Sequence, residues 1–331
     1  MTGEPLLRVA GLNVRLPVGG EMRQVLSGVD LTIEAGEAVG LVGESGSGKS
    51  MTARAIDRLL PAGATVEGVV EFDGRDVLGL TGNELRSIRT DVAMIFQDPR
   101  AHINPVRRIG DFMTEAAVAH RLLTMKEAEE RAVSLLESVG ISEAGRRLRQ
   151  FPHQMSGGML QRVMIAAALL PGPRLLLADE PTPALDVTTQ SEVMAILSEL
   201  RVERGLSLLF ITHDLELAAA VCDRTAVMYA GQIVEVRSSH LLHDASLHPY
   251  TAALSAARPR IDATTARLPA IPGRPRSAFE TPDDQCAFAD RCTHAADVCL
   301  TARPALIDMD GGMVRCARAH DLHPFVEAGG R

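Results

Sequence analysis

The chain reads Gly43-Glu44-Ser45-Gly46-Ser47-Gly48-Lys49-Ser50, a stretch of the form G-x-x-x-x-G-K-S that is typical of a phosphate-binding loop. The apolar run at residues 38–42 predicts a buried strand before it, and residues 51–60 predict a helix after it. Glycines let the backbone turn tightly, so its N–H groups and the positive helix N-terminus can face a phosphate. We expect Lys49 to reach the β- and γ-phosphates of a nucleotide and the Ser50 hydroxyl to help bind Mg²⁺.

The composition narrows the class of protein. A chain of 331 residues with 46% hydrophobic residues can form one large or two medium domains. The net charge of −8 argues against a protein that coats nucleic acid. Neither a signal peptide nor an apolar run of about 18 residues is visible. We therefore expect a protein of the cytosol, where its five cysteines stay reduced.

Residues 6–35 predict an antiparallel β region. Residues 7–9, 12–16 and 25–33 are strand-like, and residues 17–20 predict a turn. The pattern changes at about residue 105, where helical spacing over residues 111–123 and 126–139 predicts an inserted helical subdomain.

Further strands alternate with helices along the rest of the chain. Residues 66–72, 91–96, 175–178 and 206–212 predict strands, and residues 187–203 predict a helix. Apolar strands with helices between them indicate an α/β fold with a mostly parallel sheet. From about residue 258, prolines indicate a linker that leads to a short region with cysteines.

An acidic pair ends one of these strands, about 130 residues after the phosphate loop. We assign Asp179 to Mg²⁺ and Glu180 to the general base that polarises the attacking water. Gln97 and His213 each follow another predicted strand. An amide there can reach the metal or the water, and an imidazole can orient the water, although an isolated Gln or His is more often structural.

A second anion-binding device follows at Ser156-Gly157-Gly158. Ser156 predicts the N-cap of an apolar helix, and the glycines allow the backbone to approach an anion closely. Because one nucleotide already has a full cradle in the phosphate loop, this second device indicates a second chain.

Together these motifs resemble the ordered set of an ATP-binding-cassette (ABC) ATPase. They correspond to its Walker A loop (residues 43–50), Q-loop (Gln97), signature (MSGGM, residues 155–159), Walker B (LLLADE, residues 175–180), D-loop (Ala184-Leu185-Asp186) and H-loop (His213). The resemblance implies a head-to-tail dimer, in which Ser156, Gly157 and Gly158 of one chain close over ATP held by Lys49 of the other. It also implies that Asp186 belongs to the nucleotide site.

The C-terminal motifs extend this resemblance to the ATPases of oligopeptide, dipeptide and nickel importers. They read His248-Pro249-Tyr250-Thr251 and Ile271-Pro272-Gly273-Arg274-Pro275. The resemblance implies an ATPase domain at residues 1–240, with its helical subdomain at about 105–170, and an importer-type region at residues 241–331. It implies a peripheral protein on the cytoplasmic side of the cell membrane. Its partners would be a second ATPase subunit, identical or different, two integral-membrane permeases and an extracytoplasmic substrate-binding protein, and no nucleic acid.

The chain departs from this family in two places. Leu16 lies where the family usually has an aromatic residue that stacks on adenine, and Arg8 to Ser27 contain no aromatic residue or histidine. After Gln97, the run Arg100-Ala101-His102-Ile103 is more basic than the usual small polar run at the expected permease contact.

The remaining motif is a set of cysteines spaced C-x5-C-x6-C-x16-C, namely Cys286, Cys292, Cys299 and Cys316. Four thiolates suit an iron–sulfur cluster, zinc fits less well without a C-x2-C pair, and unliganded packing thiols are a third interpretation. The pattern C-x-F-x-x-R-C resembles importer ATPases, some of which bind a 4Fe-4S cluster, and we expect such a cluster here. Cys222 is expected to be a small buried residue.

We therefore predict an ATP-hydrolysing subunit that powers the import of peptides, with ATP and Mg²⁺ as cofactors. Three alternatives stay open: import of nickel or another small solute, a non-transport ABC ATPase that acts on DNA or ribosomes, and an inactive regulatory partner.

Overall fold

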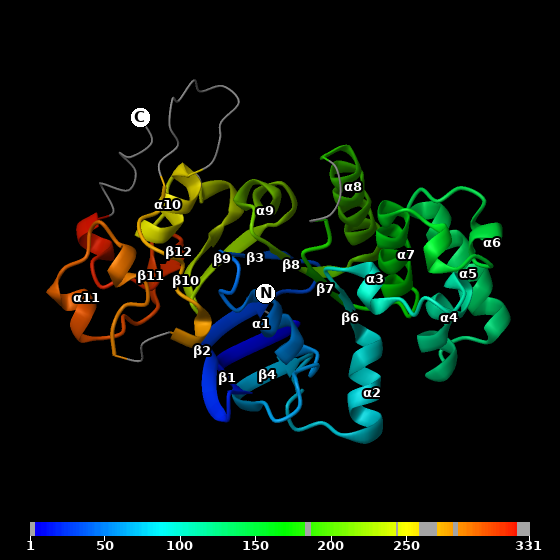
Figure 1. The fold of residues 1–331 in the computed structure, drawn as a ribbon, viewed down its shortest axis with the longest axis horizontal. Coiled ribbons are helices and arrows are strands. Elements are labelled where there is room, and N and C mark those ends of the chain that lie inside the picture. Colours follow the sequence, from blue (N-terminus) through cyan, green and yellow to red (C-terminus); the bar gives the residue numbers. More distant parts are fainter. Residues whose placement is uncertain (1–3, 183–186, 243, 258–269, 281–283, 323–331) are drawn as a thin grey trace. The chain divides into compact units, whose positions relative to one another are not determined.

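The computed structural model of the chain describes residues 4–182, 187–242, 244–257, 270–280 and 284–322 (Figure 1). Contacts between residues fall mainly within two compact units, and segments of the two units alternate along the sequence. The first unit contains Met1–Leu6, Ile33–Glu37 and Phe72–Ile211, and the second unit contains Leu7–Thr32, Ala38–Glu71 and Thr212–Arg331. Among the helices in the described ranges, none combines the length and the apolar character that a membrane span requires.

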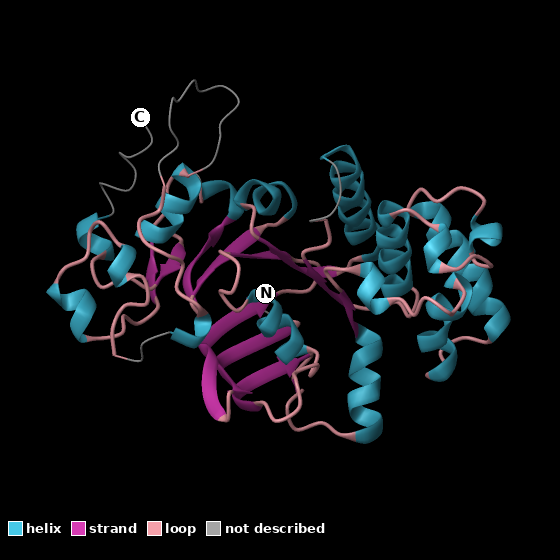
Figure 2. Ribbon diagram, viewed as in Figure 1, coloured by secondary structure: helices cyan, strands magenta, loops and turns pink. Residues whose placement is uncertain are grey.

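The first unit is built on parallel strands with β7 (Leu175–Asp179) between β6 (Val92–Ile95) and β8 (Ser207–Thr212). Every residue of β7 is buried, which explains why the sequence shows a continuous apolar run instead of an alternating one. Helix α2 (Gly82–Asp91) precedes β6, and α8 (Val187–Arg204) lies between β7 and β8 in the chain (Figure 2). The predicted α/β architecture is confirmed here, whereas α2 was not predicted.

Between β6 and β7 the first unit contains the predicted helices. They are α4 (Ile109–Ala119), α5 (Met125–Ser138) and α7 (Gly157–Leu169). A capping box begins α5, because Thr124 accepts from the backbone of Glu127 and the Glu127 carboxylate accepts from the backbone of Thr124. Buried side chains of α4 (Ile109, Met113, Ala117) and of α5 (Ala128, Ala132, Leu135, Leu136) form the helical core, as their spacing predicts.

The second unit contains the predicted antiparallel region. Strand β1 (Leu7–Val18) lies between β2 (Glu21–Ile33) and β4 (Thr65–Phe72), most of each in this unit. The turn Gly19-Gly20 joins β1 directly to β2, so these neighbours run antiparallel.

A second sheet of this unit carries the phosphate loop. Strand β3 (Ala38–Val42) is parallel to β9 (Arg224–Tyr229), which is antiparallel to β10 (Gln232–Ser238). Helices α1 (Lys49–Ile56) and α9 (Leu215–Val221) belong to the same unit, and α9 packs against β3 and β9.

The C-terminal region is more regular than its prolines suggest. Strand β12 (Gly312–Val314) extends the sheet beside β10, and β11 (Ile307–Met309) pairs with β12. Helices α10 (Pro249–Ala256) and α11 (Asp297–Thr301) and the 3₁₀ turn η4 (Ala289–Arg291) accompany these strands. The shorter elements are β5 (Arg75–Asp76), α3 (Pro99–His102), α6 (Ala144–Arg147), η1 (Pro152–Gln154), η2 (Ser239–Leu241) and η3 (Ala278–Glu280).

An aromatic cluster joins this region to the core of the second unit. The ring of Tyr229 on β9 lies 4.7 Å from Tyr250 and 5.2 Å from Phe288, measured between centroids. Both tyrosines are almost completely buried, and they are the only tyrosines in the sequence. The C-terminal region therefore shares a hydrophobic core with the strands that carry the phosphate loop.

Candidate nucleotide-binding site

The phosphate loop holds Lys49 in place. Lys49 is the first residue of α1 and only 5% exposed. Its Nζ donates to the carbonyl oxygens of Gly43 at 2.8 Å and Glu44 at 3.0 Å. Gly48 caps the helix with φ of 106°, a left-handed conformation that glycine adopts without strain. The ammonium and the helix N-terminus therefore belong to one anion-binding loop, as the motif predicts.

The loop is also packed closely against β9. A Cβ atom on Gly43 would lie 2.1 Å from the carbonyl oxygen of Met228, so only glycine fits there. The N–H of Gly231 donates to the carbonyl of Ser47 at 2.8 Å. Within the described part of the chain, the buried Ser47 hydroxyl has no hydrogen-bond partner. The Lys49 ammonium, the Ser47 hydroxyl and the N-terminus of α1 are therefore groups that could bind the phosphates of a nucleoside triphosphate.

The predicted acids and Gln97 meet in the first unit. Asp179 ends β7 and is 3% exposed. Glu180 follows with φ of 44°, which is unusual for a residue with a side chain, and its N–H donates to Ile211 at 3.0 Å. The Gln97 Nε2 donates to the Glu180 Oε2 at 2.9 Å. Residues with a strained backbone conformation, such as Glu180, occur most often at functional sites.

The other predicted residues are distributed over both units. His213 is exposed and follows β8, in the second unit with the phosphate loop. Ser156 is exposed at the N-cap of α7 in the first unit, where its Oγ accepts from the N–H of Met159 at 3.3 Å. It begins a helix of 13 residues, with Gly157 and Gly158 in its first turn. Asp186 lies outside the described residues.

The two departures from the family pattern have local explanations. Leu16 is part of β1 and only 8% exposed, so an aliphatic side chain is buried at that position. Asp98 caps α3 by accepting from the N–H of Arg100 at 2.9 Å, and the His102 ring stacks on Phe96 with centroids 4.0 Å apart. The run after Gln97 is therefore a short capped helix.

A role for the motif at residues 248–251 was not predicted. The Tyr250 hydroxyl accepts from the N–H of Glu44 in the phosphate loop at 3.0 Å. The His248 Nδ1 caps α10 by accepting from the N–H of Tyr250 at 3.0 Å, and Pro249 takes the first helical position. The sequence contained a signal for this role. Pro249 after His248 is typical of a helix start, and Tyr250, one of two tyrosines in the sequence, follows directly.

Two buried titratable side chains, Glu235 and His248, support this motif. Glu235 on β10 is fully buried and accepts from the N–H groups of Leu247 and His248, each at 2.9 Å. Burial raises the pKa of the Glu235 carboxyl, against these hydrogen bonds. Burial also lowers the pKa of His248 to about 3. The histidine is therefore neutral at physiological pH, which its role as a cap acceptor requires.

The cysteines of the C-terminal region surround one small pocket. Its lining includes Cys286, Cys292, Cys299 and Cys316. All of them are free thiols. Burial raises the pKa of Cys286 and Cys316 to about 11, so these thiols are protonated at neutral pH. Within the described ranges, no group of three or more His, Cys, Asp or Glu side chains has an arrangement that could hold a metal ion. The four thiols therefore line the same pocket, but their arrangement is not one that could ligate a metal ion.

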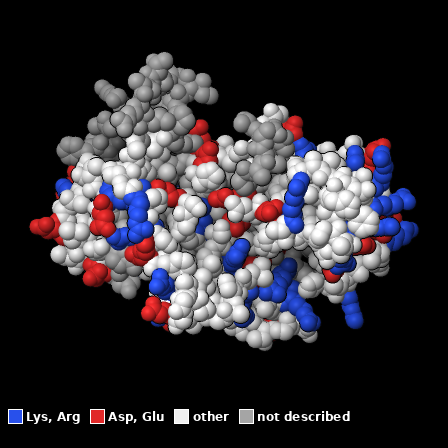
Figure 3. Space-filling view, viewed as in Figure 1, with Lys and Arg blue, Asp and Glu red and all other residues white. Residues whose placement is uncertain are grey.

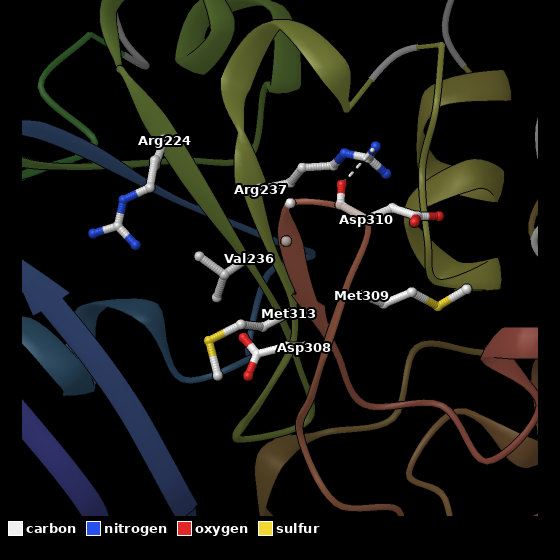
Figure 4. Close-up of a pocket in the computed structure, with 9 residues that line it drawn as sticks. Arg224, Val236, Arg237, Asp308, Met309, Asp310 and Met313 are labelled. Carbon is white, nitrogen blue, oxygen red and sulfur yellow. Dashed lines mark hydrogen bonds between the residues drawn. The ribbon is translucent and has the colours of Figure 1, made fainter.

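A different pocket is lined by residues of β9, β10 and the β11–β12 hairpin (Figure 4). Arg224 and Arg237 point to opposite sides of it, and Arg237 donates to the backbone carbonyls of Ala245 and Asp310. None of the predicted site residues lines this pocket. On the face drawn in Figure 3, basic side chains are interspersed with acidic ones over much of the described surface.

Comparisons with known proteins cover both parts of the chain. Residues 26–183 match the family model described as "ABC transporter", and residues 234–299 match "Oligopeptide/dipeptide transporter, C-terminal region". The oligopeptide transport ATP-binding protein OppD of Escherichia coli (strain K12) is 41% identical over 91% of this chain and 89% of its own length. The dipeptide transport ATP-binding protein DppD of Bacillus subtilis (strain 168) is 40% identical over 95% of this chain and 94% of its own.

Solved structures agree in fold. The dimeric post-hydrolysis state of the ATP-binding cassette MJ0796, bound to ADP and Pi, matches with a TM-score of 0.64 and 30% identity. The match covers 70% of this chain and 98% of that one.

Proposed function

Because the chain belongs to the ATP-binding subunits of oligopeptide and dipeptide ABC transporters, we propose that it hydrolyses ATP to power the import of peptides. It has the α/β cassette fold of that family, with a mixed sheet and a separate antiparallel sheet. The observation that carries the proposal is that one chain matches both the cassette and the C-terminal region of peptide transporters.

The residues of the site take separate roles in this proposal. The phosphate loop, from Gly43 to Ser50, binds the triphosphate of ATP through Lys49 and its backbone N–H groups. Ser50, Asp179 and Gln97 would hold Mg²⁺, which would supply positive charge to the phosphates. Glu180 takes the proton of the attacking water. The hydrogen bond from Gln97 to Glu180 supports this role, because it aims the carboxylate.

A second cassette completes the site. The exposed N-cap of α7 leaves Ser156, Gly157 and Gly158 available to an anion from outside their own chain. We assign them to ATP held by the partner cassette, with Asp186 at the same dimer interface and His213 orienting the water. The cassette relative solved as a dimer supports this arrangement.

Two permeases would supply the transport path and a substrate-binding protein would deliver the cargo, a proposal that the likeness to peptide transport ATP-binding proteins supports. The subunit would then lie on the cytoplasmic side of the cell membrane, held by its permeases. Residues 1–240 would form the ATPase domain, with the helical subdomain at about 105–170, and residues 241–331 the importer-type region.

We also propose a 4Fe-4S cluster at the cysteine pocket. Its support is that four free thiols line one pocket. Its difficulty is that these thiols are not in a ligating arrangement, and the raised pKa values of Cys286 and Cys316 mean that binding must release protons. The role of such a cluster would be to order the C-terminal region.

Affinity purification tests the transport function. The tagged chain is isolated from detergent-solubilised membranes, and its partners are identified by mass spectrometry. We expect two multi-span permeases and a second cassette ATPase, and the retained binding protein would indicate the cargo, whether peptide, nickel or another solute. Recovery of ribosomes or DNA without a permease would contradict transport.

A further inference from the structure

Arg291 makes an ion pair with a residue of the phosphate loop. Its Nη1 lies 2.6 Å from the Oε2 of Glu44, and its Nη2 lies 3.1 Å from the Oε1. The pair is bidentate, the geometry in which arginine binds a carboxylate most strongly. The Arg291 side chain is only 5% exposed and that of Glu44 is 22% exposed. Arg291 and Glu44 are 247 residues apart in sequence, so the contact joins the C-terminal region to the loop.

The position of Arg291 is fixed from several sides. Its Nε donates to the carbonyl of Pro272 at 2.8 Å, and its Nη1 donates to the Tyr229 hydroxyl at 3.3 Å. The guanidinium also lies over the rings of Tyr229 and Phe288, 5.7 and 5.9 Å from their centroids. A guanidinium held by this many contacts can act as a fixed anchor for Glu44.

Two more contacts from the C-terminal region reach the same loop. The N–H of Ala278 donates to the carbonyl of Gly46 at 3.2 Å, and the Tyr250 hydroxyl accepts from the N–H of Glu44 at 3.0 Å. Glu44 and Gly46 of the phosphate loop are therefore held by contacts from α10, η3 and η4. A loop that is already in its binding shape does not lose conformational freedom when the ligand arrives.

We propose that Arg291 is a positioning residue of the nucleotide site, which holds the phosphate loop in its ATP-binding shape through Glu44. The inference rests on the proposed function, since it names what the C-terminal region does for the same site. It also gives the C-terminal region a local role in nucleotide binding, in addition to any contact with other subunits.

Variants of the full chain separate this role from general stability. Arg291→Gln removes the charge, and Arg291→Lys keeps it without the bidentate geometry. The matched control is Arg303→Gln, because Arg303 also ties the C-terminal region to β2, by donating to the hydroxyl and carbonyl of Ser27, a residue outside the phosphate loop. Glu44→Gln and the double variant Glu44→Gln/Arg291→Gln complete a double-mutant cycle.

The readouts are equilibrium binding of MgATP to the purified chain and steady-state hydrolysis by the assembled transporter. We expect Arg291→Gln to raise the Kd and the KM for MgATP about tenfold, the effect of losing a hydrogen bond to a charged group. At saturating ATP, kcat should stay within about twofold, because Arg291 does not touch the reacting atoms. Arg291→Lys should recover part of the affinity, and Arg303→Gln should bind MgATP like the wild type.

Wild-type affinity in a folded Arg291→Gln variant would overturn the inference and leave the ATPase function standing. If that variant does not fold, wild-type affinity in Glu44→Gln would overturn it in the same way. An equal loss of affinity in Arg303→Gln would also overturn it, because the effect would then come from general loosening. Failure of the wild-type chain to bind MgATP would instead overturn the proposed function itself.

Discussion

Replacing His248 with Asn should remove a large part of the loss of stability on acidification. The folded chain lowers the pKa of His248 to about 3, because the ring is completely buried. In the unfolded chain a histidine titrates near pH 6.5. The folded-state pKa is therefore depressed, so the stability that His248 contributes is fully present above about pH 6.5 and is lost as the pH falls towards 3.

The size of the effect follows from these values. At about pH 5 the unfolded histidine is almost fully protonated, whereas the folded histidine is still neutral. Linkage then predicts that His248 lowers the free energy of unfolding by about 2 kcal/mol between pH 7 and pH 5. This result hardly depends on the folded pKa, as long as it lies well below 5. Protonation would also remove the lone pair of Nδ1 that caps α10.

Urea unfolding, followed by circular dichroism at both pH values, measures this difference. Asn keeps a cap acceptor for the N–H of Tyr250 but cannot be protonated, so His248→Asn should show a pH dependence about 2 kcal/mol smaller than the wild type. The opposite effect of Glu235, whose pKa burial raises, is present in both proteins and cancels. His240→Asn, at an exposed histidine, is the control. Equal pH dependence in His248→Asn and the wild type would refute the argument.

Two further predictions concern the catalytic base and the cysteines. Glu180→Gln should bind MgATP but reduce kcat by about 10²- to 10⁴-fold, because it keeps the contact with Gln97 and loses the base, and normal turnover would contradict the assignment. Chain purified without oxygen should contain about four irons with matching sulfide if the pocket holds a 4Fe-4S cluster. Cys299→Ser should lose this iron and Cys222→Ser should keep it, since Cys222 is not part of the pocket lining. Metal-free wild-type protein, or zinc in place of iron, would contradict the cluster.

Local motifs made most of the site predictable from the sequence. The phosphate loop is one continuous stretch, so its strand, glycines and helix could be placed without tertiary information. The contact between Gln97 and Glu180 spans 83 residues, yet each residue follows a predicted strand. Carboxyl ends of parallel strands share an edge of the sheet, and β6 and β7 are parallel neighbours. The order of the motifs therefore carried real spatial information.

The C-terminal region contains helices and strands that could not be predicted from the sequence. Its prolines predicted a linker from about residue 258, part of which lies outside the described residues, and no elements were predicted in the cysteine-bearing region beyond it, because periodicity detects only elements that are several turns or residues long. The β11–β12 hairpin and α11 are too short for that. The hairpin pairs with the sheet edge at β10, and the buried Val314 of β12 packs with Leu247 and Ala319. The carbonyl of Cys299 in α11 accepts from the N–H of Cys286. Helix α2 was missed for a different reason, since it has a single buried residue, Ile88, and so no apolar stripe.

The ion pair between Arg291 and Glu44 explains how an acidic residue can belong to a loop that binds phosphate. An unpaired carboxylate at Glu44 would repel a triphosphate, and this repulsion is weakly screened in a partly buried site. The bidentate contact with Arg291 neutralises that charge. Glu44→Gln should therefore reduce the affinity for MgATP less than Arg291→Gln does, because only the arginine variant leaves a negative charge beside the phosphates. In the double variant the charge is gone again, and the affinity should rise above that of Arg291→Gln alone. A double variant that binds more weakly than Arg291→Gln would contradict this electrostatic explanation, and the role of Arg291 would then be limited to the shape of the loop.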